Sequence, residues 1–81
     1  MEDRLLVFRA HAIQRMFERR ISSADVRQVL ATGEAIAEYP DDAPYPSRLL
    51  LGWSGARPLH VVVADNTEDG ERIIITVYEP D

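Results

Sequence analysis

Apolar residues near the start of the chain recur three and four positions apart, which is the spacing of an amphipathic helix with one buried face. Within residues 10–19 this repeat falls on Ile13, Met16 and Phe17. It predicts a first helix that turns these three side chains toward the core. The apolar run at residues 5–8 is either an edge strand or the lead-in to that helix.

A second helix has clearer boundaries. Ser22 is a suitable N-cap residue with Asp25 three positions later, which is close to a capping box. Ile21 before the cap and Val26 at the fourth helical position are spaced for a hydrophobic staple, and Gly33 stands where the helix should end. The apolar stripe of this helix is Val26, Val29 and Leu30. The two helices are therefore predicted to form an αα-hairpin with short arms.

After the second helix the apolar period changes to two, which is typical of β-strands. Strands are predicted at residues 35–39, 48–53, 59–64 and 72–78. The prolines of segment 40–46 cannot donate to a strand ladder, so this segment is predicted to be a loop. Short links make an antiparallel meander the simplest topology. The expected fold is one α+β domain over residues 1–81, with two N-terminal helices packed on an antiparallel sheet of about four strands.

Composition narrows the class of protein. An apolar fraction of 46% in 81 residues is enough for one folded core, and without cysteine neither disulfides nor thiolate metal sites can support it. Met1 is followed by charged residues rather than by the apolar stretch of a secretion signal. No run approaches the roughly 18 apolar residues of a membrane span. A cytoplasmic location without membrane attachment is therefore expected.

Charge is distributed unevenly along the chain. The net charge is −5, which argues against a protein that coats nucleic acid through charge alone. Residues 4–27 carry six arginines against two acids, whereas residues 58–81 carry one arginine against six acids. All nine basic residues are arginine, the better bidentate partner for phosphate and carboxylate. The basic front half indicates either a local anion site or ordinary surface charge with a biased distribution.

Two histidines are the main candidates for chemistry. Strand alternation places His60 on the face opposite Leu59 and Val61, where it is a base held by the scaffold or a half-buried structural residue. His11 and Arg15 are one turn apart on the polar face of the first helix. A histidine and an arginine at that spacing can contact one phosphate, the histidine moving a proton and the arginine holding charge. The alternative is a solvated helix face.

Two further residues belong to the candidate set. Arg48 lies on the strand face opposite Leu49 and anchors a phosphate or caps carbonyls of the adjacent loop. Tyr78 ends the last strand, where it either acts on a substrate or is an ordinary polar residue at the rim of the sheet. Tyr39, Tyr45 and Trp53 are aromatic residues that can stack on bases, although Trp53 is placed in the core. No metal-ligand spacing and no glycine-rich phosphate loop occurs, so neither a metal nor a cofactor is expected.

Taken in order, several short motifs resemble a family of small prokaryotic proteins labelled as a domain of unknown function. The motifs are H-A-x-x-R-M (His11 to Met16), L-x-x-G-E (Leu30 to Glu34), Y-P-x-D-x-P-Y-P-S (Tyr39 to Ser47), R-P-L-H-V-V (Arg57 to Val62) and I-T-V-Y-E-P (Ile75 to Pro80). The resemblance runs from about residue 8 to the end. It implies a RelE/ParE-like toxin fold, related to the mRNA interferases of toxin–antitoxin pairs, and a neighbouring antitoxin with a small zinc-finger domain.

Two functional hypotheses follow. In the first, the protein is a toxin-like, metal-independent endoribonuclease that uses the 2′-hydroxyl of RNA as nucleophile. His60 or His11 would take the proton, Arg15 and Arg48 would stabilise the phosphorane charge, and Tyr78 would assist. In the second, the protein is a non-catalytic module of the same fold that binds a partner protein, which suits the acidic composition and the lack of lysine.

Overall fold

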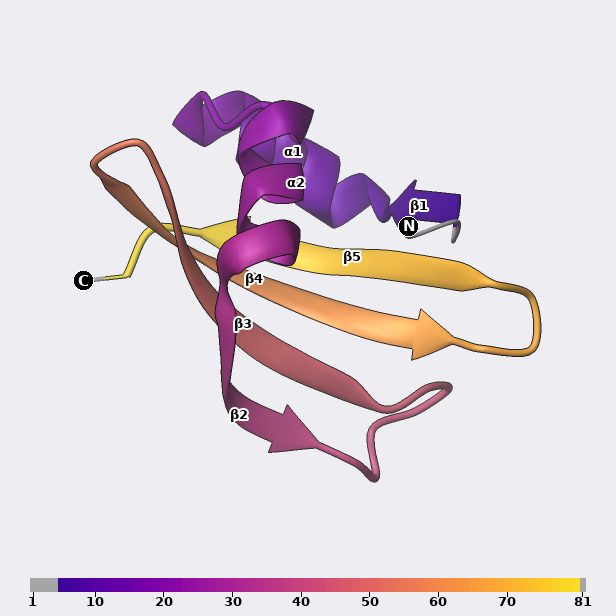
Figure 1. Ribbon diagram of the computed structural model, residues 1–81. Coiled ribbons are helices and arrows are strands. Elements are labelled where there is room, and N and C mark those ends of the chain that lie inside the picture. The colour runs from indigo at the N-terminus through magenta and orange to yellow at the C-terminus, as the bar shows by residue number, and fades with distance from the viewer. Residues whose placement is uncertain (1–4, 81) are drawn as a thin grey trace.

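The computed structural model of the protein describes residues 5–80, so both ends of the predicted 1–81 domain, with Met1 to Arg4 and Asp81, lie outside the described residues. Residues 5–80 form two helices and five strands (Figure 1). In chain order they are β1 (Leu5–Phe8), α1 (Ala10–Arg19), α2 (Ser23–Thr32), β2 (Glu34–Tyr39), β3 (Ser47–Ser54), β4 (Arg57–Asn66) and β5 (Glu71–Tyr78). The α+β class is confirmed.

The sheet has one strand more than the sequence pattern predicts. Its order is β1-β5-β4-β3-β2, and the last four strands form the antiparallel meander that was expected. The run at residues 5–8 forms the additional edge strand, which pairs in parallel with the first half of β5. The helices therefore do not open the chain but connect β1 to β2, the strand at the opposite edge.

Both helices cover the same side of the sheet, which we call the helix face (Figure 1). Both pack on the sheet, as predicted, but on different strands, α1 against β5 and α2 against β3 and β4. Cross-strand neighbours such as Leu50 and Val61 supply the sheet side of the core, and Val26 and Val29 supply the α2 side. Shielding these side chains from water is the main stabilising term of so small a domain.

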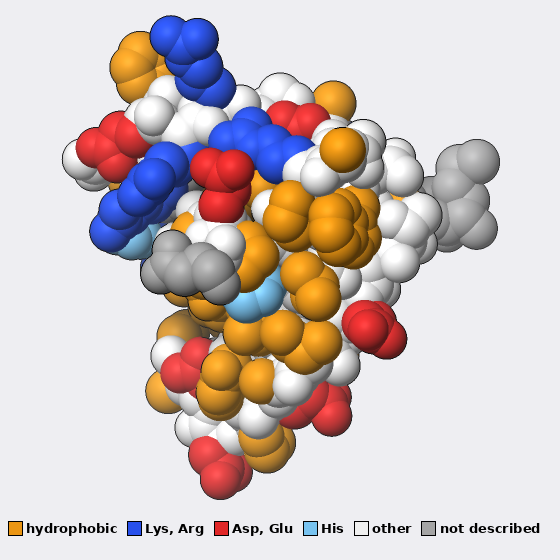
Figure 2. Space-filling view, turned by 90° about the vertical axis from the view of Figure 1, so that its left-hand side faces the viewer, with side chains coloured by type: hydrophobic (Ala, Val, Ile, Leu, Met, Phe, Trp, Pro, Cys, Tyr) orange, Lys and Arg blue, Asp and Glu red, His pale blue; other side chains and the backbone are white. Residues whose placement is uncertain are grey.

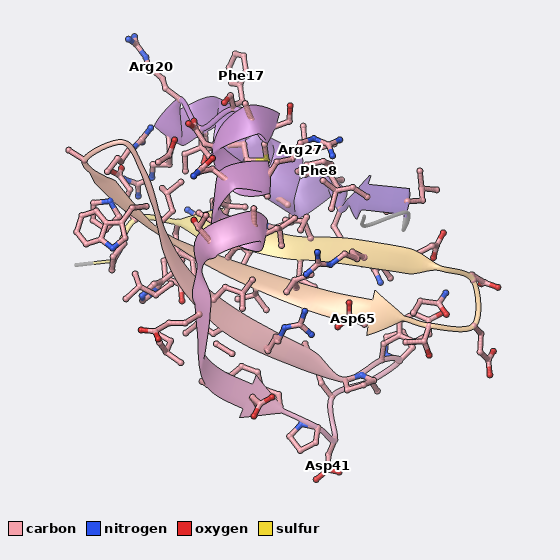
Figure 3. The ribbon with its side chains drawn as sticks, viewed as in Figure 1. Phe8, Phe17, Arg20, Arg27, Asp41 and Asp65 are labelled. Carbon is pink, nitrogen blue, oxygen red and sulfur yellow. The ribbon has the colours of Figure 1, made fainter. Side chains whose placement is uncertain are left out.

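The predicted core stripe of α1 is confirmed for Met16 and wrong for Ile13 and Phe17. Ala12 and Met16 are buried, whereas Ile13 is 55% and Phe17 87% exposed. Phe17 points away from the sheet (Figure 3). A residue next to a buried one is rotated by 100° around the axis, so a small error in the phase of the stripe moves a large side chain from core to solvent.

The start of α2 follows its sequence signature. The Ser22 hydroxyl accepts a hydrogen bond from the Asp25 backbone N–H at 3.1 Å, and the Asp25 carboxylate accepts one from the Ser22 N–H at 2.8 Å. This is the reciprocal capping box. The Ser54 hydroxyl also donates to Asp25, at 2.5 Å, and so joins the helix start to the end of β3.

Two glycines allow α2 to lie close to β3. Gly33 ends the helix, but with a negative φ, so it is needed for space and not for a left-handed turn. A Cβ there would lie 2.6 Å from the Val29 carbonyl oxygen and 2.9 Å from that of Leu51. At Gly52 a Cβ would lie 2.9 Å from Val29 Cγ1. The helix–strand distance is therefore set by the absence of two side chains.

The other side of the sheet, which we call the open face, is covered by no helix of residues 5–80 (Figure 1). At one end it meets the loop before β3, since Pro44 and Tyr45 line a hollow together with Ala64 of β4. At the other end Trp53 is 54% exposed, so its predicted place in the core is wrong. No helix between Leu5 and Pro80 has the length and apolar character needed to cross a membrane.

Candidate functional site

His60 and Tyr78 lie side by side on the open face. They are directly paired across β4 and β5, with Leu51 of β3 opposite His60 on the other side. The imidazole and phenol rings meet edge to face, with ring centroids 5.2 Å apart and an interplanar angle of 80°. Both side chains are half-buried, so their rings are held by the sheet while part of each remains accessible to a ligand.

The two ring nitrogens of His60 differ in environment. Nδ1 is buried and has no hydrogen-bond partner among residues 5–80. A proton on Nδ1 would be buried without an acceptor, which costs free energy, so the neutral ring holds its proton on Nε2. His60 is therefore suited to donate a hydrogen bond from Nε2 to a group on the open face.

A row of basic side chains lies along one side of α1. His11, Arg15 and Arg19 are exposed and four residues apart, so they lie on one side of the helix. At one end His11 lines the same hollow as Ile75 of β5. At the other end the charge of Arg19 acts on Glu79, which follows β5. The two ends of the row are thus near Ile75 and near Glu79, and Arg15 lies between them on the helix.

Arg15 is free to bind an anion. Within the described part of the chain neither Arg15 nor Arg9 makes a hydrogen bond or ion pair with another side chain. A guanidinium without an internal carboxylate partner keeps its five donors available for phosphate. Figure 2, which faces this end of the sheet, shows arginine side chains in a band above hydrophobic side chains that surround a histidine.

His11 and His60 are placed beside different parts of β5. His11 borders Ile75, whereas His60 is paired with Tyr78, three residues along the same strand. Three residues of strand span about 10 Å. The structure thus groups His60 and Tyr78, places Arg15 in the row beside them, and sets His11 at the far end of that row.

Arg48 does not belong to this group. Its side chain lies on the helix face, because Leu51, three residues later on a regular strand, shares the open face with His60. There it forms a half-buried hydrogen-bonded ion pair with Asp65, and Arg72 Nε lies 3.8 Å from the same carboxylate. The sequence-based role of Arg48 as a phosphate anchor beside His60 therefore conflicts with its position, since strand alternation turns it to the opposite side.

Arg57 ties the end of α1 to the end of β5. Its guanidinium donates to the backbone oxygens of Arg20 at 2.9 Å and Arg19 at 2.5 Å, and to Glu79 Oε2 at 3.1 Å. The hydrogen bond from Arg57 is the main reason that the pKa of Glu79 lies below its usual value. Glu79 in turn raises the pKa of Arg57. No local sequence pattern marks this contact, because its partners are more than 20 residues apart.

In the described part of the chain no three histidine or acidic side chains are grouped so that they could hold a metal ion. The geometry instead presents hydrogen-bond donors: His60 Nε2, the Tyr78 hydroxyl and the guanidinium of Arg15. The rings of His60 and Tyr78 are held by the sheet, and donors of this kind can stabilise negative charge on a bound phosphate.

No curated protein and no solved structure matches the chain. A family model does match it, over residues 8–79, and the description of that family is "Domain of unknown function (DUF4258)". The matched residues include all of the groups described above and nearly the whole domain. The chain therefore belongs to the DUF4258 family.

Proposed function

We propose that the protein is a metal-independent endoribonuclease, and that it acts as the toxin-like component of a toxin–antitoxin pair. The observation that carries the ribonuclease proposal is the His60–Tyr78 pair on an uncovered sheet face, beside a row of positive side chains. The toxin context rests on the sequence resemblance to RelE/ParE-like proteins. RNA cleavage of this kind needs no metal, because the neighbouring 2′-hydroxyl of the RNA is the nucleophile.

The proposed reaction is a transesterification. The 2′-oxygen forms a bond to phosphorus, the bond from phosphorus to the 5′-oxygen breaks, and a 2′,3′-cyclic phosphate results. The 2′-hydroxyl proton passes to solvent, and water protonates the departing 5′-oxygen. His60 Nε2 and the Tyr78 hydroxyl donate hydrogen bonds to the phosphorane oxygens, and Arg15 adds positive charge. This role for His60 replaces the proton acceptor expected from the sequence, because a proton held on Nδ1 would be buried without an acceptor.

Incubation of the purified protein with RNA in EDTA tests the proposal. Cleavage with 2′,3′-cyclic phosphate ends is the expected result, on naked or on ribosome-bound RNA. The matched control is the His60→Ala variant, which should lose cleavage while it keeps its fold. If cleavage stops in EDTA and returns with a divalent metal, the proposed mechanism is wrong although the protein is an enzyme. If no RNA is cleaved in any condition, the ribonuclease proposal is wrong.

A second candidate function, binding of a partner protein without catalysis, is favoured by α1. Ile13 and Phe17 are four residues apart, so they form one exposed apolar pair on the outer side of this helix. Large exposed apolar side chains that lie together often mark a protein interface. The partner would be the antitoxin implied by the resemblance, with its zinc-finger domain.

Co-expression with the product of the adjacent gene separates the two candidates. A stable complex with wild type that is lost in Phe17→Ala, together with no cleavage by the free protein, supports the binding module. Growth arrest on induction of the free protein, relieved by the adjacent gene and absent in His60→Ala, supports the toxin.

A further inference from the structure

We propose that Trp53 is the stacking surface for an RNA base next to the phosphate at His60. This inference rests on the proposed ribonuclease function and adds to it a residue that orients the single-stranded substrate. Trp53 is the only tryptophan of the chain, and 54% of its side chain is exposed. A large ring left in water on a strand is a ready platform for a nucleobase, because every base has an aromatic face.

The register of the sheet places Trp53 beside the candidate site. Trp53 pairs with Pro58 across β3 and β4, and His60 is two residues beyond Pro58. Trp53 and His60 are thus diagonal neighbours on the open face. Residues in this relation are about 7–8 Å apart at the backbone, a distance that an indole ring can span. The unbroken β3–β4 pairing fixes this relation without any loop.

Charge sets the direction in which a nucleotide would lie. The positive row with Arg15 lies beyond β5, on one side of His60 and Tyr78. On the other side, past β3, Glu34 of β2 is paired with Leu51 and is exposed. A phosphate is attracted to the arginine side and repelled from the carboxylate. The backbone would therefore lie toward α1, and the uncharged base toward Trp53.

The distances suit a single strand that crosses the β-strands. From β5 through β4 to β3 the sheet spans two interstrand spacings, about 10 Å in total. The surface between is formed by His60, Tyr78 and the half-buried apolar side chains Leu51 and Pro58. A duplex could not lay a base face on Trp53, because its bases are already stacked on each other. The inferred ligand is therefore single-stranded RNA.

Fluorescence of the single tryptophan provides a direct test. The probe is a short single-stranded RNA oligonucleotide with 2′-O-methyl groups, which cannot be cleaved by the proposed reaction. Saturable quenching of Trp53 emission is expected, and it should weaken when the oligonucleotide carries an abasic position at the stacked base. By anisotropy of a labelled oligonucleotide, Trp53→Ala should raise the dissociation constant by roughly 5- to 150-fold. Trp53→Phe should restore most of the affinity, which a loss of folding would not allow.

Phe17→Ala is the matched control, since it removes another exposed aromatic ring, on the outer side of α1, and should leave the dissociation constant unchanged. If Trp53→Ala binds and cleaves RNA like wild type, the stacking inference is wrong while the ribonuclease proposal stands. If the oligonucleotide quenches Trp53 but no RNA is ever cleaved, the stacking inference stands and the ribonuclease proposal falls. If Trp53 emission instead changes with protein concentration alone and not with RNA, a second copy covers the residue and the inference is wrong.

Discussion

The imidazole of His60 and the phenol of Tyr78 face each other across β4 and β5, with ring centroids 5.2 Å apart and the rings almost perpendicular. This edge-to-face contact has a favourable geometry for two aromatic rings, and it orients the imidazole on the sheet surface. Because the contact is made by rings, the hydroxyl of Tyr78 and Nε2 of His60 are left to act on a ligand. Substitutions can therefore remove a hydrogen-bond donor of this pair while they leave the ring contact in place.

Tyr78→Phe should keep the ring contact and remove only the hydroxyl. The melting temperature should stay near that of wild type, whereas RNA cleavage falls because one hydrogen-bond donor to the phosphorane is lost. For His60→Ala we expect cleavage to fall by about 10²- to 10³-fold, the usual effect of losing one such donor. Rates with saturating RNA, measured beside thermal unfolding of each variant, check both expectations. Equal cleavage by Tyr78→Phe and wild type would remove the hydroxyl from the site.

Arg15 and Arg48 were both expected to contact one phosphate, but substitution of each should affect RNA cleavage and stability differently. Arg15→Ala should lower cleavage with little change in stability, because Arg15 is exposed and makes no contact with another side chain among residues 5–80. Arg48→Ala should leave cleavage per folded molecule unchanged and cost about 1–3 kcal/mol of unfolding free energy, because Asp65 loses a charged hydrogen bond. Denaturant unfolding and a cleavage assay on both variants make the comparison. A large loss of cleavage in folded Arg48→Ala would contradict the assignment of Arg48 to the opposite face.

Phe17→Ala should be nearly neutral in stability. At 87% exposure the ring buries little area in the monomer, so the change should stay within about 0.5 kcal/mol. The control is Leu59→Ala, a fully buried position at which a loss of about 2–5 kcal/mol is expected. Urea unfolding of the two variants under the same conditions tests the difference. A loss of several kcal/mol in Phe17→Ala would show that this ring is packed in the core.

Gly52→Ala should destabilise the protein by about 1–3 kcal/mol, because the new methyl group would lie 2.9 Å from Val29 Cγ1 and 3.1 Å from its Cα. Val29→Ala removes the branched side chain that the methyl group meets. The double variant should therefore be less destabilised than the sum of the two single changes. A double-mutant cycle from denaturant unfolding measures this coupling. If the two losses of unfolding free energy simply add, the contact between Gly52 and Val29 does not limit the distance between α2 and β3.

Acid should weaken the start of α2. The pKa of Asp25 lies below its ordinary value of 3.8, chiefly because the Ser54 hydroxyl and the Ser22 N–H donate to its carboxylate. A group whose folded-state pKa is lowered stabilises the fold fully above the unfolded pKa, and that contribution is lost as the pH falls through the folded value. Wild type should therefore exceed Asp25→Asn in stability at pH 6, by at most about 1 kcal/mol for a partly exposed group. The difference should shrink below pH 3.8. A difference that is independent of pH would contradict this role.

Local sequence signals determined the elements of this fold whose causes are local. The capping box at Ser22 and Asp25 is formed within four residues, and the period-two runs placed β2 to β5 in a meander joined by short links. Alternation along β4 correctly separated His60 from the buried Leu59 and Val61, because side chains of a strand alternate between its faces whatever the neighbours are.

Tertiary structure decided what depends on partners far apart in sequence. The run at residues 5–8 is a strand because β5, more than 60 residues later, offers its edge. Phe17 and Trp53 are exposed because the sheet meets α1 at Ala12 and Met16 and no helix covers the open face. Arg48 and His60 are separated by the sheet itself. Side-chain type shows what a residue can do, but which side chains meet is set by the packing of the whole domain, and no window of neighbouring residues contains that information.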